Sequence, residues 1–76
     1  MWFYDTGIKS VGIIYIKQLS INSFGTYINN NLCERCDNPE ASANNVYMHF
    51  TGCNSWDSLN GQISNVPRDL SEWEKS

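Results

Sequence analysis

The sequence is poor in basic residues. Five lysines and arginines stand against eight aspartates and glutamates in 76 residues, which gives a formal net charge of −3 at pH 7. Nucleic-acid-binding proteins concentrate positive charge to neutralise phosphates, and direct binding to nucleic acid is therefore not expected. The mild acidity fits solubility or complementarity to a basic protein partner. The cations are scattered along the chain: Lys9, Lys17, Arg35, Arg68 and Lys75.

Long hydrophobic runs are also lacking. The longest, Val11–Ile16, is far too short to span a bilayer, and no basic segment of the kind that opens a signal peptide is visible. We therefore expect no membrane association and a cytoplasmic location. An odd number of cysteines without a secretion signal disfavours a disulfide framework and favours reduced thiols or metal ligands.

Catalytic motifs are missing as well. The chain has a single histidine, no glycine-rich phosphate loop and no Gly-x-Ser-x-Gly turn. Nucleophilic catalysis by a Cys–His pair would need a third orienting group, and the spacing selects none. We expect the protein not to be an enzyme.

A chain of this length forms one small domain over residues 1–76. Surface scaling predicts a folded area of about 4,700 Å² against about 12,600 Å² for the unfolded chain. With such a small core the free energy of unfolding is close to zero, so a metal, a disulfide or a partner surface could be needed to stabilise the fold.

The N-terminal part reads as strands. Trp2–Tyr4 and Val11–Ile16 are rich in β-branched and aromatic residues, and a turn signal separates them, which predicts an antiparallel hairpin. Residues 20–32 are ambiguous, because the two-residue alternation reaches Ile21 while a helical spacing also begins there. We favour a helix, with apolar positions Ile21, Phe24, Ile28 and Leu32.

The C-terminal half reads as short helices. Asn38 and Pro39 fit the start of a helix that would end near Thr51 with Gly52 as its stop. A strand over Val46–Phe50 is the alternative. Two further helical turns are expected, one carrying Trp56, Leu59 and Ile63 and one beginning at Asp69. The predicted fold class is α+β, with a small N-terminal antiparallel hairpin or sheet packed against two or three short helices.

One group of residues has the spacing of a metal-binding site. Cys33, Cys36, His49 and Cys53 have the spacing Cys-x2-Cys-x12-His-x3-Cys, which matches a zinc-finger site whose last ligand is cysteine. Four nitrogen and sulfur ligands suit tetrahedral Zn²⁺, and binding worth ~10–16 kcal/mol would decide folding in a marginal chain. The supporting core of a ββα finger is matched only in part. The competing interpretation is that the cysteines are reduced, small apolar residues.

Three functions follow. The first is a small non-enzymatic module that binds another protein as an inhibitor, adaptor or subunit, which would suit a phage or mobile-element protein aimed at a host factor. Trp56 and Trp73 are its candidate partner-binding residues, although both rings would also serve as core. The alternative is a zinc-stabilised finger-like module with one structural zinc, and otherwise no cofactor is expected. The third is a thiol redox protein using Cys33 and Cys36.

Overall fold

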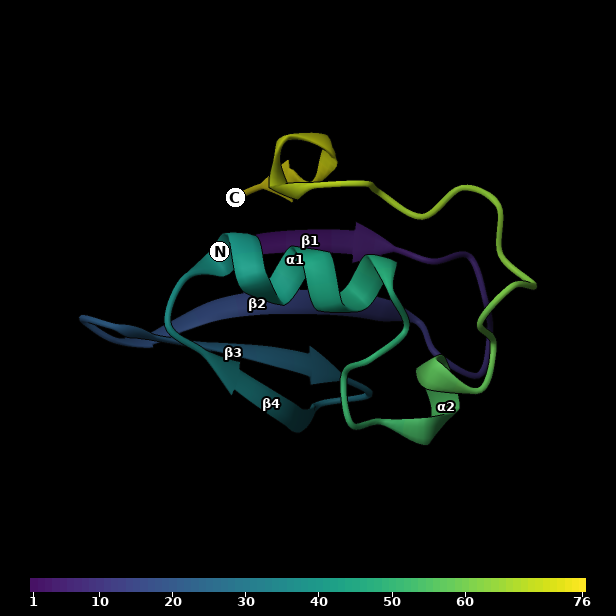
Figure 1. Cartoon of the computed structure of the whole chain (residues 1–76), viewed down its shortest axis with the longest axis horizontal. Coiled ribbons are helices and arrows are strands. Elements are labelled where there is room, and N and C mark those ends of the chain that lie inside the picture. The colour runs from purple at the N-terminus through teal and green to yellow at the C-terminus, as the bar shows by residue number, and fades with distance from the viewer.

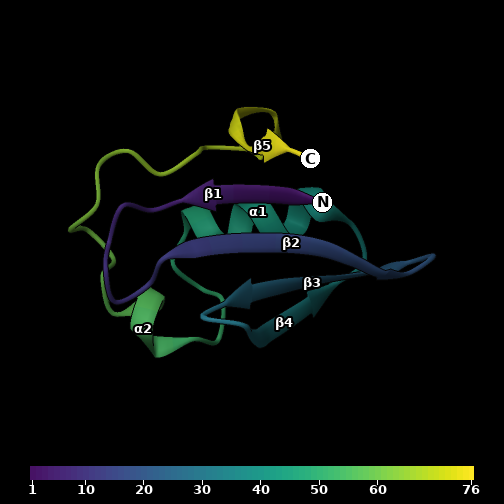
Figure 2. The ribbon, with the colours of Figure 1, turned by 180° about the vertical axis from the view of Figure 1, so that it is seen from behind.

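Five strands form one antiparallel sheet in the computed structural model of residues 1–76, in the order β4-β3-β2-β1-β5. One main helix, α1, packs on one face of this sheet and runs along the direction of β1 and β2, and the opposite face is uncovered (Figures 1 and 2). The expected α+β class, with an N-terminal antiparallel sheet packed against short helices, is confirmed. The elements are β1 (Trp2–Asp5), β2 (Ile13–Ser20), β3 (Ser23–Ile28), β4 (Asn31–Cys36), α1 (Pro39–Tyr47), α2 (Asn54–Asp57), the 3₁₀ turn η1 (Leu70–Glu72) and β5 (Glu74–Lys75).

The predicted N-terminal hairpin is present. Strand β1 pairs antiparallel with β2, with Trp2 opposite Ile16 and Tyr4 opposite Ile14. These four side chains share the face that α1 covers, because alternate residues of a strand point to the same side of a sheet. Ile14 and Ile16 are fully buried there.

Residues 20–32 are not a helix, contrary to our expectation. They form the last residue of β2, the turn after it, all of β3, a tight turn and the start of β4. Asn29 and Asn30, the two turn residues, have φ values of 54° and 63°. Two successive positive φ angles define the type I′ turn that joins antiparallel strands most tightly, and asparagine tolerates that conformation well.

Helix α1 begins as predicted but ends earlier. The side chain of Asn38 caps it by accepting a hydrogen bond from the Ala41 amide at 2.7 Å. The helix ends at Tyr47, and His49 then adopts a left-handed φ of 55°. The predicted end near Thr51 and the alternative strand over Val46–Phe50 are both wrong, because the chain already turns at His49.

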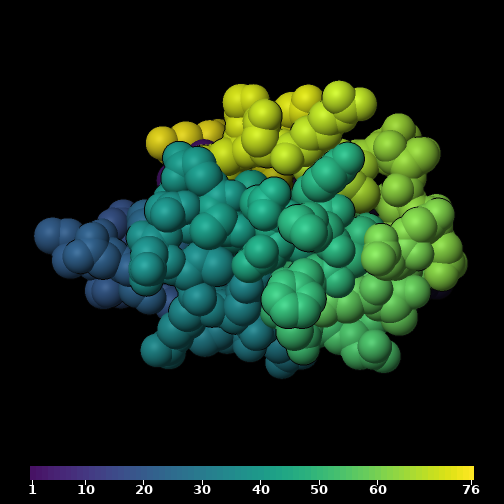
Figure 3. Space-filling model, viewed as in Figure 1, coloured from purple at the N-terminus to yellow at the C-terminus, as the bar shows by residue number.

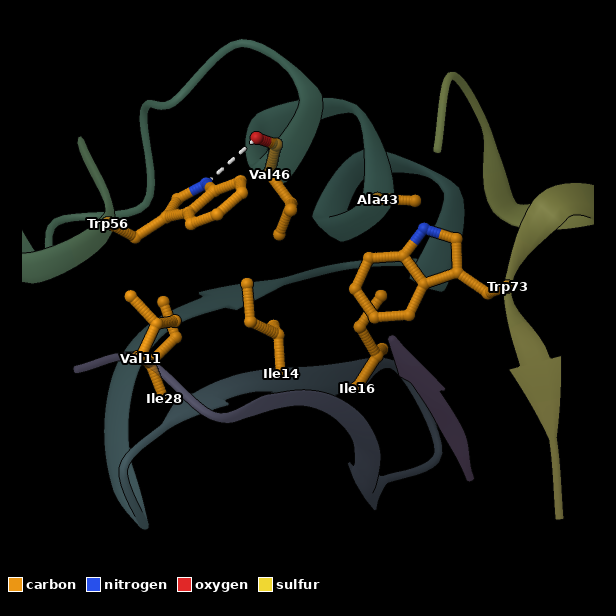
Figure 4. Packing of buried hydrophobic residues seen from close by; sticks show 8 residues of the cluster. All are labelled: Val11, Ile14, Ile16, Ile28, Ala43, Val46, Trp56 and Trp73. Carbon is orange, nitrogen blue, oxygen red and sulfur yellow. Dashed lines mark hydrogen bonds between the residues drawn. The ribbon is translucent and has the colours of Figure 1, made fainter. Parts of the chain in front are cut away.

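The core lies between the covered face of the sheet and α1 (Figure 4). The Trp56 ring closes one end of this layer, where its indole N–H donates to the Val46 carbonyl at 3.0 Å. Trp73 closes the other end and packs edge-on against Tyr4, with ring centroids 5.7 Å apart. The buried apolar residues are Val11, Ile14, Ile16, Ile28, Ala43, Val46, Trp56 and Trp73.

The C-terminal third wraps around this core with little regular structure. The predicted helix carrying Trp56 ends at Asp57 and does not reach Ile63. The predicted turn at Asp69 is present, since the Asp69 carboxylate accepts a hydrogen bond from the Ser71 amide at 2.9 Å. The folded surface area is 4725 Å², close to the value expected from chain length.

The two ends of the chain meet. The Ser76 amide donates to the Met1 carbonyl at 2.9 Å, and the Met1 ammonium donates to the Ser76 carbonyl at 3.2 Å. This contact extends the pairing of β5 with β1 (Figure 2). None of the helices combines the length and the apolar character that crossing a bilayer requires.

Candidate functional site

Cys33 and Cys53 are joined by a disulfide bond, with 5.4 Å between their Cα atoms. The bond ties β4 to the segment that leads into α2. It corrects our expectation that the cysteines would be reduced, and it leaves Cys36 as the free thiol. Gly52 permits the close approach of the two segments, because a Cβ at this position would lie 3.0 Å from the Cys33 carbonyl oxygen.

A bulge in β4 explains how Cys33 reaches its partner. Thr26 pairs with Glu34 and Tyr27 with Leu32, so Cys33 is the extra residue of the strand. A bulge redirects a side chain, and the Cys33 side chain packs against the core. Cys36, three positions further along an extended strand, has its Cα roughly 10 Å away.

The four predicted zinc ligands are therefore not brought to one point. The structure contains no group of three or more histidine, cysteine, aspartate or glutamate side chains placed to hold a metal ion. The two sulfurs of the disulfide could become thiolate ligands only after reduction. Zinc binding stays a prediction that concerns the reduced chain.

His49 serves the core. Its ring stacks on Trp56 with centroids 4.3 Å apart, and its Nδ1 lies 2.9 Å from the Trp56 carbonyl oxygen. The side chain is only 7% exposed. Trp56 is fully buried and Trp73 is 7% exposed, so neither ring offers a surface to a partner in this conformation.

Cys36 belongs to a polar cluster between β4 and α1. Its thiol lies 3.5 Å from Glu34 Oε1, and Asn45 donates to the same carboxylate oxygen at 2.8 Å. Burial raises the pKa of the Cys36 thiol; the nearby Ser42 side chain partly offsets this effect, and the negative charges of Glu34 and Asp37 add to it. A raised pKa lowers the thiolate fraction at neutral pH, which does not favour a nucleophilic or redox role for Cys36.

Three hydroxyl or carboxylate oxygens of this region are buried without a hydrogen-bond partner. They are Thr26 Oγ1, Glu34 Oε2 and Ser42 Oγ. Burial raises the pKa of Glu34, although the hydrogen bonds from Asn45 and Cys36 oppose this and Asp57 adds repulsion. No pattern in the sequence marked this cluster, because its members come from β3, β4 and α1 and meet only in the fold.

Apart from Ile21, the large apolar residues with the highest exposed fractions lie where α1 ends. Tyr47 is 45% exposed, Met48 is 58% exposed and Phe50 is 75% exposed. We call these three residues the apolar knuckle. His49 interrupts them and points inward, so its stacking on Trp56 fixes the backbone that carries the knuckle. Figure 3 shows side chains of this segment protruding beside the C-terminal chain.

An open groove of about 390 Å³ adjoins the knuckle. Tyr47 and Met48 form one wall, and Ile63 and Val66 contribute apolar side chains to the other. Asp57 rigidifies the chain just after the knuckle: its carboxylate accepts hydrogen bonds from the Thr51 hydroxyl at 2.8 Å and from the Gly52 amide at 2.9 Å.

No pattern in the sequence marked the knuckle, because its residues lie in a segment that was expected to be the end of a longer helix or a strand. Comparison of the chain with known protein families, with curated proteins and with solved structures finds no match. The surface described above is accordingly the basis for assigning a function.

Proposed function

We propose that the protein is a small non-enzymatic module that binds another protein through the apolar knuckle. The observation that carries this proposal is the exposure of Tyr47, Met48 and Phe50, at 45%, 58% and 75%, within four successive residues. Large apolar side chains gathered at one exposed place are a common mark of a protein contact site. The proposal replaces Trp56 and Trp73 as anchors with residues that a partner can reach.

The backbone of the knuckle is held before any partner arrives. His49 is anchored to Trp56 by stacking and by its Nδ1 contact, and Asp57 binds the two residues that follow Phe50. A rigid contact surface loses little conformational entropy on binding, and this favours affinity. The adjoining groove could receive an apolar side chain of the partner between Met48 and Ile63.

The test combines photo-crosslinking with a matched pair of variants. A photoreactive amino acid at position 50 should crosslink one partner protein, whereas the same group at the even more exposed position 21 should not. The double variant Met48→Ser/Phe50→Ser should weaken binding about tenfold or more, as expected from loss of central apolar anchors. The matched control Leu19→Ser/Ile21→Ser removes two exposed apolar side chains from the β2–β3 turn region.

Urea denaturation of both double variants should show nearly unchanged stability, because all four side chains are exposed. The proposal would be refuted if Met48→Ser/Phe50→Ser still bound the partner. It would also be refuted if Leu19→Ser/Ile21→Ser lost the partner, because the contact would then lie elsewhere.

A further inference from the structure

A second depression, of about 460 Å³, lies at the opposite end of α1. Trp2 at the start of β1, Glu40 in the first turn of α1, and Asp69, Leu70 and Ser71 around η1 form its walls. Figure 1 shows these three parts of the chain side by side near both termini. Glu40 and Asp69 are exposed, while Trp2 and Leu70 are half-buried and pack against the core.

The walls combine the two groups that bind organic cations. An indole ring attracts a cation to its face, and carboxylates pair with ammonium or guanidinium groups. The chain itself supplies evidence that the Trp2 ring accepts a cation: the Lys75 ammonium lies 4.9 Å from its centroid. Lys75 comes from the exposed strand β5 and is not one of the residues that line the depression.

The local charge also favours a cation. Of the residues that line the depression, Glu40 and Asp69 each bring a negative charge and none brings a positive one. Outside the lining, the N-terminal end of α1 contributes about half a positive charge, Lys75 lies over the Trp2 ring, and the Met1 ammonium is paired with Ser76. Asp69 uses only Oδ1 to cap η1, since both the amide and the hydroxyl of Ser71 donate to that atom. Its other carboxylate oxygen is left for a ligand.

We propose that this depression binds an arginine side chain of a partner protein. The planar guanidinium stacks on an aromatic face and pairs with a carboxylate at the same time, which a lysine ammonium does less well. Trp2 and Leu70 would cover the methylene stem of the arginine. The site shares with the proposed function only the premise that the ligand belongs to a protein. Glu40 and Tyr47 are roughly 10 Å apart along α1, so one partner could contact both surfaces.

The experiment is an NMR titration of the isotope-labelled protein with N-acetyl-arginine amide. The expected result is a saturable shift of the Trp2 indole N–H signal and of the Glu40, Leu70 and Ser71 amides. N-acetyl-citrulline amide, which has nearly the same shape without the charge, should leave these signals in place. Glu40→Gln should weaken binding of the arginine probe about three- to fivefold, the effect of losing one exposed ion pair.

Three further measurements make the outcome decisive. Glu74→Gln changes the net charge equally and should bind the probe as the parent does, whereas Lys75→Met should bind more tightly because a positive charge next to the Trp2 ring is gone. Phe50→Ser should not alter probe binding, so failure at the knuckle and failure at this site can be told apart. Equal binding of citrulline, shifts elsewhere, no effect of Glu40→Gln, or tighter binding of spermidine than of the arginine probe would each overturn the proposal.

Discussion

Among single residues, Glu34 has the least favourable surroundings for its charge. One carboxylate oxygen accepts from Asn45, while the other is buried without a partner near the equally unpaired Thr26 hydroxyl across the strands. An unsatisfied buried polar group is costly, and the ionised form suffers most. Protonation would turn the orphaned oxygen into a hydrogen-bond donor.

The pH dependence follows from the direction of the pKa shift. Burial raises the pKa of Glu34 above its ordinary value of 4.5. At pH values between the ordinary and the raised pKa of Glu34, the folded chain binds more protons at this carboxyl group than the unfolded chain does. The contribution of Glu34 to stability therefore falls as pH rises through this window, and it recovers in acid.

Glu34→Gln should consequently stabilise the protein at neutral pH, by about 1 kcal/mol, because a neutral amide can donate where the carboxylate cannot. The gain should shrink as the pH is lowered below the ordinary pKa of the carboxyl group. Urea denaturation at a series of pH values measures it, with the exposed Glu74→Gln in β5 as control. A gain independent of pH, or a loss at neutral pH, would contradict this account of the cluster.

Among the elements, the loop between α1 and α2 depends on one side chain. Asp57 accepts hydrogen bonds from the Thr51 amide, the Thr51 hydroxyl and the Gly52 amide. Hydrogen bonds to a charged group contribute more than neutral ones. The first turn of α2 thus holds the segment that follows the knuckle.

Asp57→Ala should destabilise the protein by about 2 kcal/mol, since two backbone amides and a buried hydroxyl lose a charged acceptor. Hydrogen exchange should accelerate at Thr51 and Gly52 more than in the sheet. Asn54→Ala, an exposed change in the same helix, is the control. Uniform acceleration over the whole chain would show that Asp57 acts on global stability and not on this loop.

The elements that could be predicted from the sequence have local signals, and the elements that could not be predicted have ambiguous ones. The β1–β2 hairpin and the start of α1 were predictable because their signals are local: strand-forming residues, and Asn38 ahead of Pro39. Residues 20–32 were wrongly predicted as a helix because apolar residues four positions apart fit one face of a strand as well as one face of a helix. Phe24 and Ile28 point to the same side of β3, and the Asn29-Asn30 pair is a turn signal that a helical interpretation treats only as a weakness.

At the scale of the whole molecule, the disulfide connects the sheet to the C-terminal half. It joins two residues that are 20 positions apart in the sequence, Cys33 and Cys53. Its formation depends on the tertiary contact of β4 with the segment before α2, which spacing along the chain does not reveal. The cysteine pattern grouped Cys33 and Cys53 with Cys36 and His49 as metal ligands, and a disulfide bond between two of the cysteines was not expected.

Reduction of the protein, or the variant Cys53→Ser, should lower the free energy of unfolding by about 3 kcal/mol. A thiol assay in denaturant without reductant should find one thiol per chain, from Cys36, and the control Cys36→Ser should find none. Three thiols together with one bound zinc would instead support the finger-like module. A cytoplasmic location stays a prediction, and the disulfide favours an oxidising compartment.

The meeting of the two chain ends has its own consequence. Because Met1 and Ser76 already exchange hydrogen bonds across adjacent strands, the backbone could be closed into a ring with little rearrangement. The exposed turn at Ile21 and Asn22 would then be a natural place to open it again. The order of the strands in the sequence could therefore be changed without changing their order in the sheet. A circularly permuted protein could then carry the knuckle and the arginine site unchanged.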